Sequence, residues 1–347
     1  ISSEFFNSII KSCARFTYNE VAHLLSKGDT EKKYTAVIDI LKNMRQLSKI
    51  LRKKRFNSGS VDFQAPEPEI HMNSKCEVEK ITKAGHNEAH ELIEEFMLSA
   101  NQAVAHHLLN QKIPFIRRIH EPPTESKITA FNEFIAGFGL RLHSTDRVDS
   151  ADLQNTLNKV RGRPEERVIN TLLLRTMKKA QYSQKDSGHF CLGFEHYTHF
   201  TSPIRRYPDL ITHRLLKTYM NHKCSAHEKN TIKKELIEIA DHSTLRERKA
   251  MEVEREINDL RRAQYMSNKI GKIFTGIIVN VTSFGFFVEL TEVFVEGLVH
   301  ISSLTDDYYI HIEQEHKLRG QRQHKVYEIG ERVKIRVKQV DISLRRI

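Results

Sequence analysis

The sequence predicts an α+β fold in which a long, mainly helical region is followed by a small closed β-barrel. Apolar residues recur every three to four positions through most of residues 1–268, which is the period of amphipathic helices. From residue 272 the period changes to two, and short strands with bends follow one another, a pattern typical of a small barrel. A length of 347 residues suits two or three domains. We therefore expect one domain over residues 1–268 and another over residues 269–347.

Caps and breakers divide the helical region into elements. Ser58-Gly59-Ser60 ends one helix, and Thr124 and Asp149 have the form of caps that begin others. In chain order the spacing predicts a helix through Phe5, Ile9, Ile10 and Cys13, a helix from residue 34 that ends in the basic cluster 49–55, and a hairpin containing residues 70–81. Then follow a helix over 87–109, a strand over 113–119, helices over 124–138, 153–160 and 165–180, a strand over 190–194, and a long charged helix within 227–268.

The overall charge favours an acidic partner. Lys and Arg number 55 against 44 Asp and Glu, a formal net charge of +11, which suits nucleic acid or an anionic membrane surface. No apolar run is long enough to span a membrane, and no leader is evident. The four cysteines lie far apart, without a C-x-x-C pair, so we expect reduced thiols and a cytoplasmic protein. Ile1 and Ile347 both fall within ongoing patterns, so we expect both ends to be cut.

Residues 196–209 combine aromatic side chains, two adjacent arginines and two helix-start signals. Ser202 before Pro203 has the form of an N-cap, which would leave backbone N–H groups free to meet an anion. The guanidinium groups of Arg205 and Arg206 suit phosphate oxygens. This stretch therefore predicts a tight turn that binds phosphate and leads into a helix. The alternative is that the arginine pair neutralises carboxylates of its own domain.

Other basic and aromatic features also allow two interpretations. The cluster from Lys49 to Arg55 fits a solvated helix face as well as a nucleic-acid contact. In the barrel, Phe284 and Phe287 lie on either side of a glycine, and His300 ends a later strand. Exposed rings on a barrel face stack bases at about 1–3 kcal/mol each. The alternative for both phenylalanines is the barrel core.

Acidic residues offer weak metal signals. Asp146, Asp149 and Asp152 recur every third residue, but Asp149 is better explained as a helix cap. Asp306 and Asp307 are adjacent beside two tyrosines, which favours a solvated turn in a barrel loop. Neither group is predicted to hold a metal ion.

The barrel resembles a known module. Residues 271–290, together with Glu296-Gly-Leu-Val-His-Ile-Ser-Ser303, are similar to the S1-type RNA-binding OB-fold, a small five-stranded barrel, and the match spans residues 270–347. In that family an aromatic, a histidine and late acidic and basic positions form the RNA face. The resemblance implies RNA contacts at Phe284, Phe287, His300, Asp341 and Arg345.

The helical region contains five further motifs, at residues 91–101, 118–123, 188–193, 198–210 and 213–217. Together they resemble the ribonuclease II and ribonuclease R exoribonucleases, most closely ribonuclease R. With the barrel, this resemblance covers essentially the whole chain, as the back half of the RNB catalytic domain followed by the S1-type domain. It implies 3′-to-5′ hydrolysis of single-stranded RNA, one nucleotide at a time, with a divalent metal.

The resemblance also assigns site residues. Arg205 would be catalytic, holding a phosphate near the scissile bond, with RNA contacts from Arg206 and Tyr207 beside it. Glu94 or Glu95 would face the ribose, where a 2′-hydroxyl can be recognised by one acceptor. The remaining contacts implied are Phe63, which would cap the base stack, and Glu254, which would meet the strand as it enters the channel.

One departure from the family concerns the metal. The family binds Mg²⁺ with aspartates spaced D-x-x-x-x-x-D-x-D-D, upstream of the motifs found here, and such carboxylates hold the ion and activate water. This sequence contains no such cluster. The chain is therefore predicted to bind single-stranded RNA but to be inactive alone.

Two alternatives stay open. One is a non-catalytic RNA-binding protein on the same scaffold, and the other is a structural role in a ribonucleoprotein through charge alone, which does not need the Phe284 and Phe287 pair. In each case single-stranded RNA is the expected partner, with no membrane. Association with RNA-decay or ribosome-linked machinery is a further expectation.

Overall fold

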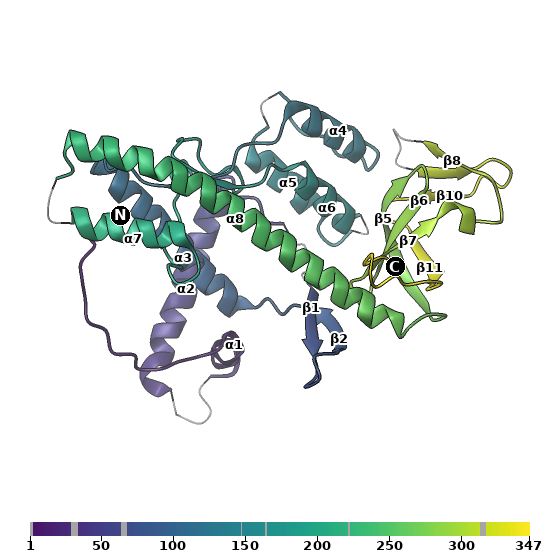
Figure 1. Cartoon of the computed structure of the whole chain (residues 1–347), viewed down its shortest axis with the longest axis horizontal. Helices are drawn as coiled ribbons and strands as arrows, with labels where there is room; N and C mark the ends of the chain where they lie inside the picture. Colours follow the sequence, from purple (N-terminus) through teal and green to yellow (C-terminus); the bar gives the residue numbers. More distant parts are fainter. Residues whose placement is uncertain are drawn as a thin grey trace.

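The computed structural model describes residues 3–28, 34–63, 68–146, 148–163, 165–220, 223–312 and 317–347 (Figure 1). Its helices and strands confirm the α+β class. In these ranges the α-helices are α1 (Tyr18–Lys27), α2 (Thr35–Asn57), α3 (Glu88–Asn110), α4 (Glu125–Ala136), α5 (Ser150–Val160), α6 (Glu166–Thr176), α7 (Tyr207–Tyr219) and α8 (Ala226–Ser267).

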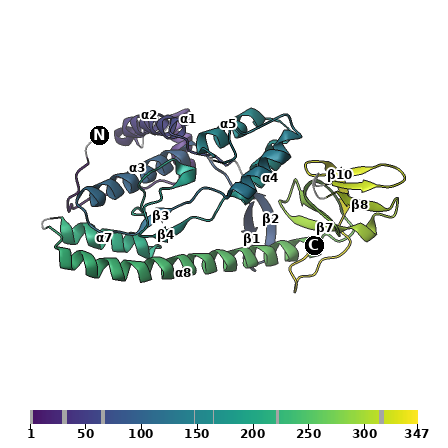
Figure 2. The same ribbon diagram turned by 90° about the horizontal axis from the view of Figure 1, so that it is seen from above.

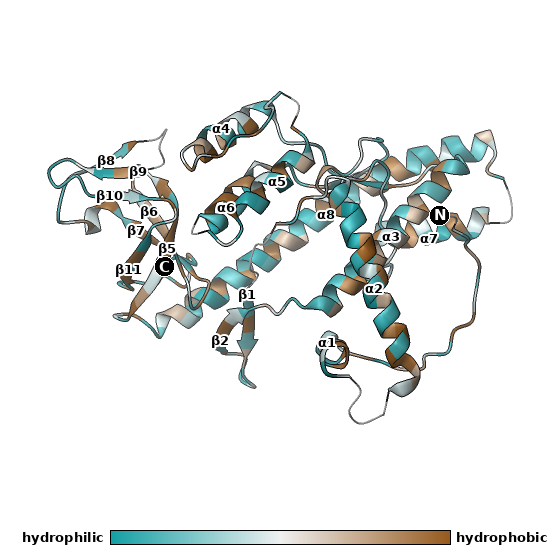
Figure 3. Cartoon of the chain, turned by 180° about the vertical axis from the view of Figure 1, so that it is seen from behind, coloured by the Kyte–Doolittle hydropathy of each residue, from teal (hydrophilic) through white to brown (hydrophobic). Residues whose placement is uncertain are grey.

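The molecule is elongated, and α8 runs along most of its length (Figure 1). Helices α3 and α7 lie beside one half of α8, and the barrel lies at its other end, as Figure 2 shows from above. Hydrophilic residues predominate along α8 (Figure 3), in keeping with its dense charge. The helix begins at a capping box in which Ser225 and Glu228 each hold the other's backbone N–H.

The first predicted helix is wrong. Residues 3–17 form no helix or strand, although the sequence predicted a helix through Phe5, Ile9, Ile10 and Cys13. Ile9 and Ile10 are exposed, so their apolar stripe has no surface to pack against. Phe5, from the same predicted stripe, contacts the ring of His107 on α3, at 4.7 Å between ring centroids. Because most helical stability comes from packing, periodicity alone does not form a helix here.

The next elements follow the predictions closely. Helix α2 ends at Asn57, one residue before the Ser-Gly-Ser break, and α3 begins after the cap residue Asn87. Between them, β1 (Pro68–Met72) and β2 (Val78–Lys83) form the predicted antiparallel hairpin. The strand predicted over residues 113–119 is shorter, since only β3 (Arg117–Ile119) pairs, with β4 (Gln181–Ser183).

Helices α4, α5 and α6 share one apolar core, which includes Phe131, Leu153 and Ile169. Asp149 caps α5, because its Oδ1 accepts the backbone N–H of Ala151 at 3.1 Å. The cap prediction is therefore confirmed.

The strand predicted over residues 190–194 is wrong. Residues Phe190–Leu192 form a single 3₁₀ turn, η1. Gly193 then takes a left-handed φ of 64°, which reverses the chain and lets it pass close to Ser58. Phe190 and Cys191 pack against the α4–α6 core, so their apolar character serves that core and not a sheet.

The barrel follows α8. Its strands, within residues 273–312 and 317–336, are β5 (Ile273–Thr282), β6 (Gly285–Leu290), β7 (Glu296–His300), β8 (Tyr309–Ile312), β9 (Lys317–Gly320), β10 (Val326–Glu328) and β11 (Arg332–Arg336). They form two sheets, in the orders β11-β5-β6-β7 and β10-β9-β8, around one core. That core includes Phe286, Val288 and Leu318, and it is closed at one side by Met266 of α8 and Ile81 of the hairpin.

Ion pairs also tie the barrel to the helical region. Arg167 of α6 pairs with Glu289 of β6, and Arg345 near the C-terminal end pairs with Glu256 of α8 at 3.0 Å. The barrel is thus held against both α6 and α8.

Candidate functional site

Residues 202–206 form the predicted tight turn. The carbonyl of Ser202 accepts the backbone N–H groups of Arg205, at 3.3 Å, and of Arg206, at 3.0 Å. Helix α7 begins after this turn, at Tyr207, with Pro208 in its first turn. The helix start predicted at Ser202-Pro203 is therefore wrong, because the turn itself uses the amides that a helix N-terminus would have left free.

A buried carboxylate organises the turn. Asp209 is fully buried, and its Oδ1 accepts both the backbone N–H of Ser202, at 2.8 Å, and Nη2 of Arg206, at 2.7 Å. Arg206 therefore neutralises a carboxylate of its own domain, which is the alternative that the sequence left open. The backbone and the guanidinium share one acceptor, so the turn has a defined shape.

Arg205 differs from its neighbour. Its side chain is exposed and forms no hydrogen bond or ion pair with any residue that the structure describes. Ile204 and Tyr207, on either side of the arginine pair, are also exposed. Because the turn is fixed and the Arg205 guanidinium has no described internal partner, this side chain can bind an external phosphate.

Asn101 on α3 holds the preceding loop. Its Oδ1 accepts the backbone N–H groups of Phe200, at 2.9 Å, and Thr201, at 3.2 Å, and its Nδ2 donates to Oη of Tyr197 at 2.9 Å. Sequence reasoning missed this residue. The signal was present, because Asn101 is a polar residue within the apolar stripe of α3 and such a buried amide needs partners.

Histidines and tyrosines that are buried or half-buried form a chain of tilted and edge-on ring contacts. The rings of His120, His189, Tyr197, His199 and Tyr182 follow one another at 5.1 to 5.7 Å between centroids. Burial, reinforced by nearby charges including Arg118, lowers the pKa of His189 to about 3 and that of His199 to about 2. Burial also raises the pKa of Tyr182 to about 12. These rings are neutral near pH 7, so the positive charge at the turn comes from arginines.

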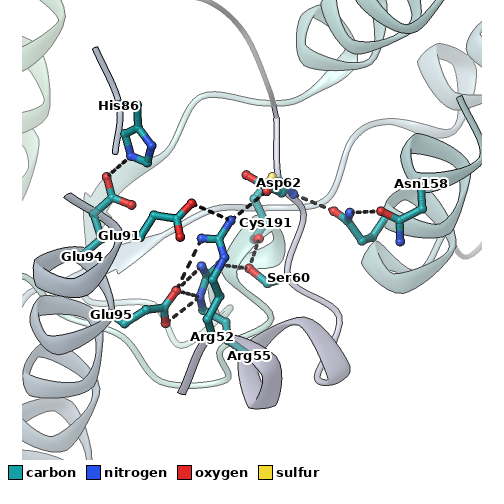
Figure 4. Close-up of polar contacts among 11 residues, drawn as sticks. Arg52, Arg55, Ser60, Asp62, His86, Glu91, Glu94, Glu95, Asn158 and Cys191 are labelled. Carbon is teal, nitrogen blue, oxygen red and sulfur yellow. Dashed lines mark hydrogen bonds and ion pairs between the residues drawn. The ribbon is translucent and has the colours of Figure 1, made fainter. Parts of the chain in front are cut away.

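The two adjacent glutamates of α3 have different surroundings (Figure 4). Glu95 is buried, and both its oxygens accept from Nε of Arg55, at 3.1 and 3.2 Å. Glu94 is half exposed and accepts from His86 at 3.0 Å. The structure thus leaves Glu94 accessible and commits Glu95 to an internal pair.

The same pairing explains much of the basic cluster from Lys49 to Arg55. Lys49 pairs with Glu88 at 3.0 Å, and Arg52 pairs with Asp62 at 3.1 Å. With Arg55 bound to Glu95, three of these cations serve the fold of their own domain.

Phe63 and Glu254 lie on separate elements. Phe63 is half buried and packs against the α4–α6 core. Glu254 is exposed on α8, where it lines a surface hollow together with Val253 and Ile257. Of the described contacts, none joins these two residues to each other or to Arg205.

Strand alternation places the aromatic residues of the barrel. Phe286 points into the core, so Phe287 lies on the opposite face of β6, across from Leu298 of β7. Phe284 is 46% exposed and meets Phe287 edge-on at 6.2 Å. His300 is exposed two positions beyond Leu298, so Phe284, Phe287 and His300 gather at one end of the β6–β7 pair.

Asp341 and Arg345, near the C-terminal end of the barrel, both make contacts within the chain. Asp341 pairs through its backbone with Arg346, and its carboxylate accepts the N–H of Leu344 at 2.9 Å. Arg345 extends to Glu256 of α8. Neither makes a described contact with the aromatic group of β6 and β7.

The adjacent barrel aspartates hold a loop together. Asp307 accepts backbone N–H groups from Arg322 and Gln323, and Asp306 accepts from Oη of Tyr309 and Nζ of Lys325. These hydrogen bonds lower the pKa of both carboxyls, although partial burial opposes the shift at each. Among the residues that the structure describes, no group of three or more His, Cys, Asp or Glu side chains is arranged to hold a metal ion.

Comparison with known proteins gives the family. Residues 1–222 match the model of the RNB domain, and residues 267–347 match that of the S1 RNA binding domain. The chain belongs to the RNB family. The RNB match ends before α8 begins, and the S1 match starts at the last residue of α8. The described part of the chain has no helix long and apolar enough to cross a membrane.

This RNB chain is similar to ribonuclease R proteins over nearly its whole length. It is 42% identical over 346 residues to ribonuclease R of Aquifex aeolicus, covering 99% of this chain and 49% of that protein. It superposes on the apo form of Mycoplasma genitalium RNase R with a TM-score of 0.89 and 34% identity, covering 96% of this chain and 52% of the other. The same enzyme in complex with ribose-methylated single-stranded RNA matches equally well. The chain thus spans about half the length of these relatives.

Proposed function

We propose that this chain is the RNA-holding part of a 3′-to-5′ exoribonuclease that hydrolyses single-stranded RNA processively to nucleoside 5′-monophosphates. The RNB and S1 matches and the ribonuclease R relatives support this proposal. The observation that carries it is the exposed, unpaired Arg205 on a turn fixed by a buried aspartate. In this role Arg205 holds a phosphate near the scissile bond.

The other contacts are divided between two regions. In the RNB region, Phe63 caps the base stack, and Glu94, in place of Glu95 with its internal pair, accepts from a ribose 2′-hydroxyl. Tyr207 lies beside Arg205, and Arg206 contributes positive field while it binds Asp209. On α8 and the barrel the proposed contacts are Glu254, Phe284, Phe287, His300, Asp341 and Arg345.

We propose further that catalysis needs Mg²⁺ and that its ligands are not in this chain. The described residues do not fit the metal, since they offer no cluster of carboxylates. The chain alone is then an RNA-binding but inactive unit of a cytoplasmic enzyme of RNA decay and processing, which acts with decay or ribosome-linked machinery.

The test is to incubate the 347-residue chain, freed of contaminating nuclease, with labelled single-stranded RNA and Mg²⁺. We expect binding without release of mononucleotides. Binding should weaken with salt, with a slope of about −0.7 per phosphate contacted. Release of mononucleotides would refute the proposal that the metal ligands are not in this chain. Binding that does not change with salt would refute the proposed phosphate contacts.

A second candidate is a non-catalytic RNA-binding protein on the same scaffold. The described residues favour it in one respect, their lack of a metal-binding group. Sequencing the gene upstream of the codon for Ile1 separates the two. An aspartate cluster encoded in frame supports the enzyme, and a start codon without one supports the binding protein.

A further inference from the structure

Arg55, at the C-terminal end of α2, joins two other segments through one buried guanidinium (Figure 4). Its Nε bonds both oxygens of Glu95 on α3, at 3.1 and 3.2 Å. Its Nη1 donates to Oγ of Ser60, at 2.5 Å, in the segment that follows α2. The Arg55 side chain is 10% exposed and that of Glu95 3%, so the pair is shielded from solvent.

Ser60 links Arg55 to a third segment of the chain. It is fully buried, and its hydroxyl donates to the carbonyl oxygen of Cys191 at 3.1 Å. The backbone N–H of Val61 donates to the same carbonyl at 2.8 Å. Cys191 lies in η1, shortly before the stretch that carries Arg205. Arg55 therefore connects α3 to the segment leading to the phosphate-binding turn.

The segment from Ser58 to Asp62 is fixed on its other sides as well. The N–H of Asp62 donates to Oε1 of Gln154 on α5 at 2.7 Å, and its carboxylate binds Arg52 at 3.1 Å. A Cβ added at Gly193 would lie 2.6 Å from the carbonyl oxygen of Ser58, so the two loops are in close contact. Phe63 follows directly from this fixed segment.

We propose that Arg55, held by Glu95, is a positioning residue that sets the place of Phe63 relative to the Arg205 turn. This inference rests on the proposed base contact of Phe63. Apolar residues of similar volume can replace a buried ion pair without loss of stability, so stability alone does not require the pair. An apolar pair could not donate a hydrogen bond to Ser60. The bond from Arg55 to Ser60 is therefore the observation that supports a positioning role.

The variants separate positioning from folding. Arg55→Met combined with Glu95→Leu removes both charges together, which avoids leaving one buried and unpaired. Ser60→Ala is a milder change that keeps the Arg55–Glu95 pair and removes the two hydrogen bonds of the Ser60 hydroxyl, from Arg55 and to Cys191. The matched control is Arg45→Met, because Arg45 lies earlier on α2 and pairs with Glu88 at 2.7 Å without a described contact to the Ser58–Asp62 segment. Thermal unfolding of each variant shows whether it is folded at the temperature of the binding measurement.

The readout is the Kd of a fluorescein-labelled oligouridylate, measured by anisotropy with the full 347-residue chain. We expect the Arg55→Met/Glu95→Leu chain to bind about tenfold more weakly, the size of one lost base stack, with a smaller loss for Ser60→Ala and none for Arg45→Met. Adding Phe63→Ala to either should weaken binding no further than Phe63→Ala alone, because the changes act through one ring.

Two results would overturn the positioning role. One is unchanged binding in both the Arg55→Met/Glu95→Leu and the Ser60→Ala chains. The other is losses that multiply with that of Phe63→Ala, which would indicate independent effects. Failure of the wild-type chain to bind the oligouridylate would instead refute the proposed function. If Arg55→Met/Glu95→Leu fails to fold, Ser60→Ala decides the question by the same coupling with Phe63→Ala.

Discussion

The Arg205 turn and the aromatic group of the barrel are built in opposite ways. Around the turn, the polar atoms that fix the backbone come from Asn101 on α3 and Asp209 on α7, both buried and distant from one another in sequence. In the barrel, Phe287 and His300 belong to the paired strands β6 and β7, and Phe284 lies in the turn just before β6. One surface depends on buried polar contacts, and the other depends on apolar packing beneath it.

This difference teaches where each surface is vulnerable. Loss of a buried partner at the turn leaves a desolvated charge behind, which is costly. Loss of an exposed ring from the barrel removes contact area without exposing the core. We therefore expect substitutions near the turn to act first on stability, and substitutions on the barrel face to act on binding.

The largest effect is expected for Asp209→Ala. It leaves the Arg206 guanidinium and the Ser202 N–H without their buried acceptor, and we expect the free energy of unfolding to fall by about 3–5 kcal/mol. Urea denaturation measures this. Asp39→Ala is the control, because Asp39 pairs with Lys42 on the exposed surface of α2 and should cost at most about 0.5 kcal/mol. Equal costs would show that the turn does not depend on its buried carboxylate.

Acid should weaken the turn region next. The folded pKa values of His189 and His199, about 3 and about 2, lie below the ordinary value of 6.5, so below pH 6.5 the unfolded chain binds more protons. Stability is then fully present above that pH and falls as the pH is lowered, by at most about 1.4 kcal/mol per pH unit for each histidine.

Urea denaturation at about pH 7, 6 and 5 checks this slope. His199→Gln should reduce the part of the slope that comes from His199. A slope that the substitution leaves unchanged would mean that other groups govern the acid sensitivity.

Phe284→Ala should act on binding alone. We expect a loss of about 1–3 kcal/mol in affinity for RNA long enough to reach the barrel, with short oligomers spared and the unfolding transition unchanged. Tyr308→Ala is the control, because Tyr308 is 70% exposed in the loop before β8. Fluorescence anisotropy with RNAs of two lengths measures the difference. If both lengths respond alike, the barrel is not the platform on which the incoming strand stacks.

The smallest change in affinity is expected for Arg205→Ala. One phosphate contact among several is lost, so the salt slope should become shallower by about 0.7, and Kd should rise modestly. In the complete enzyme turnover should fall much more than affinity, because the contact is made near the reacting bond. Lys127→Ala, an exposed cation on α4, is the control. Equal losses in turnover and affinity would indicate that Arg205 contacts RNA in the channel and not at the reacting bond.

Local patterns predicted much of the fold. The boundaries of α2, α3 and α8 followed from periodicity and caps, and the Asp149 cap was correctly preferred over a metal ligand. The failures lie where tertiary contacts decide. Ile9 and Ile10 have helical spacing but nothing to pack against, and Phe190 and Cys191 have strand-like character but serve a neighbouring core.

By itself, the sequence determined most of the helices, the change from helices to barrel strands after α8 and the residue types that suit RNA, because period, capping and strand alternation are local properties. Only the tertiary structure decided which of two adjacent residues is accessible. Arg206 and Glu95 are occupied by Asp209 and Arg55, while Arg205 stays exposed and Glu94, bonded to His86, stays half exposed. That choice depends on which partners the fold brings within hydrogen-bonding distance. Arg55 reaches Glu95 from another helix, and the first turn of α7 brings Asp209 to Arg206.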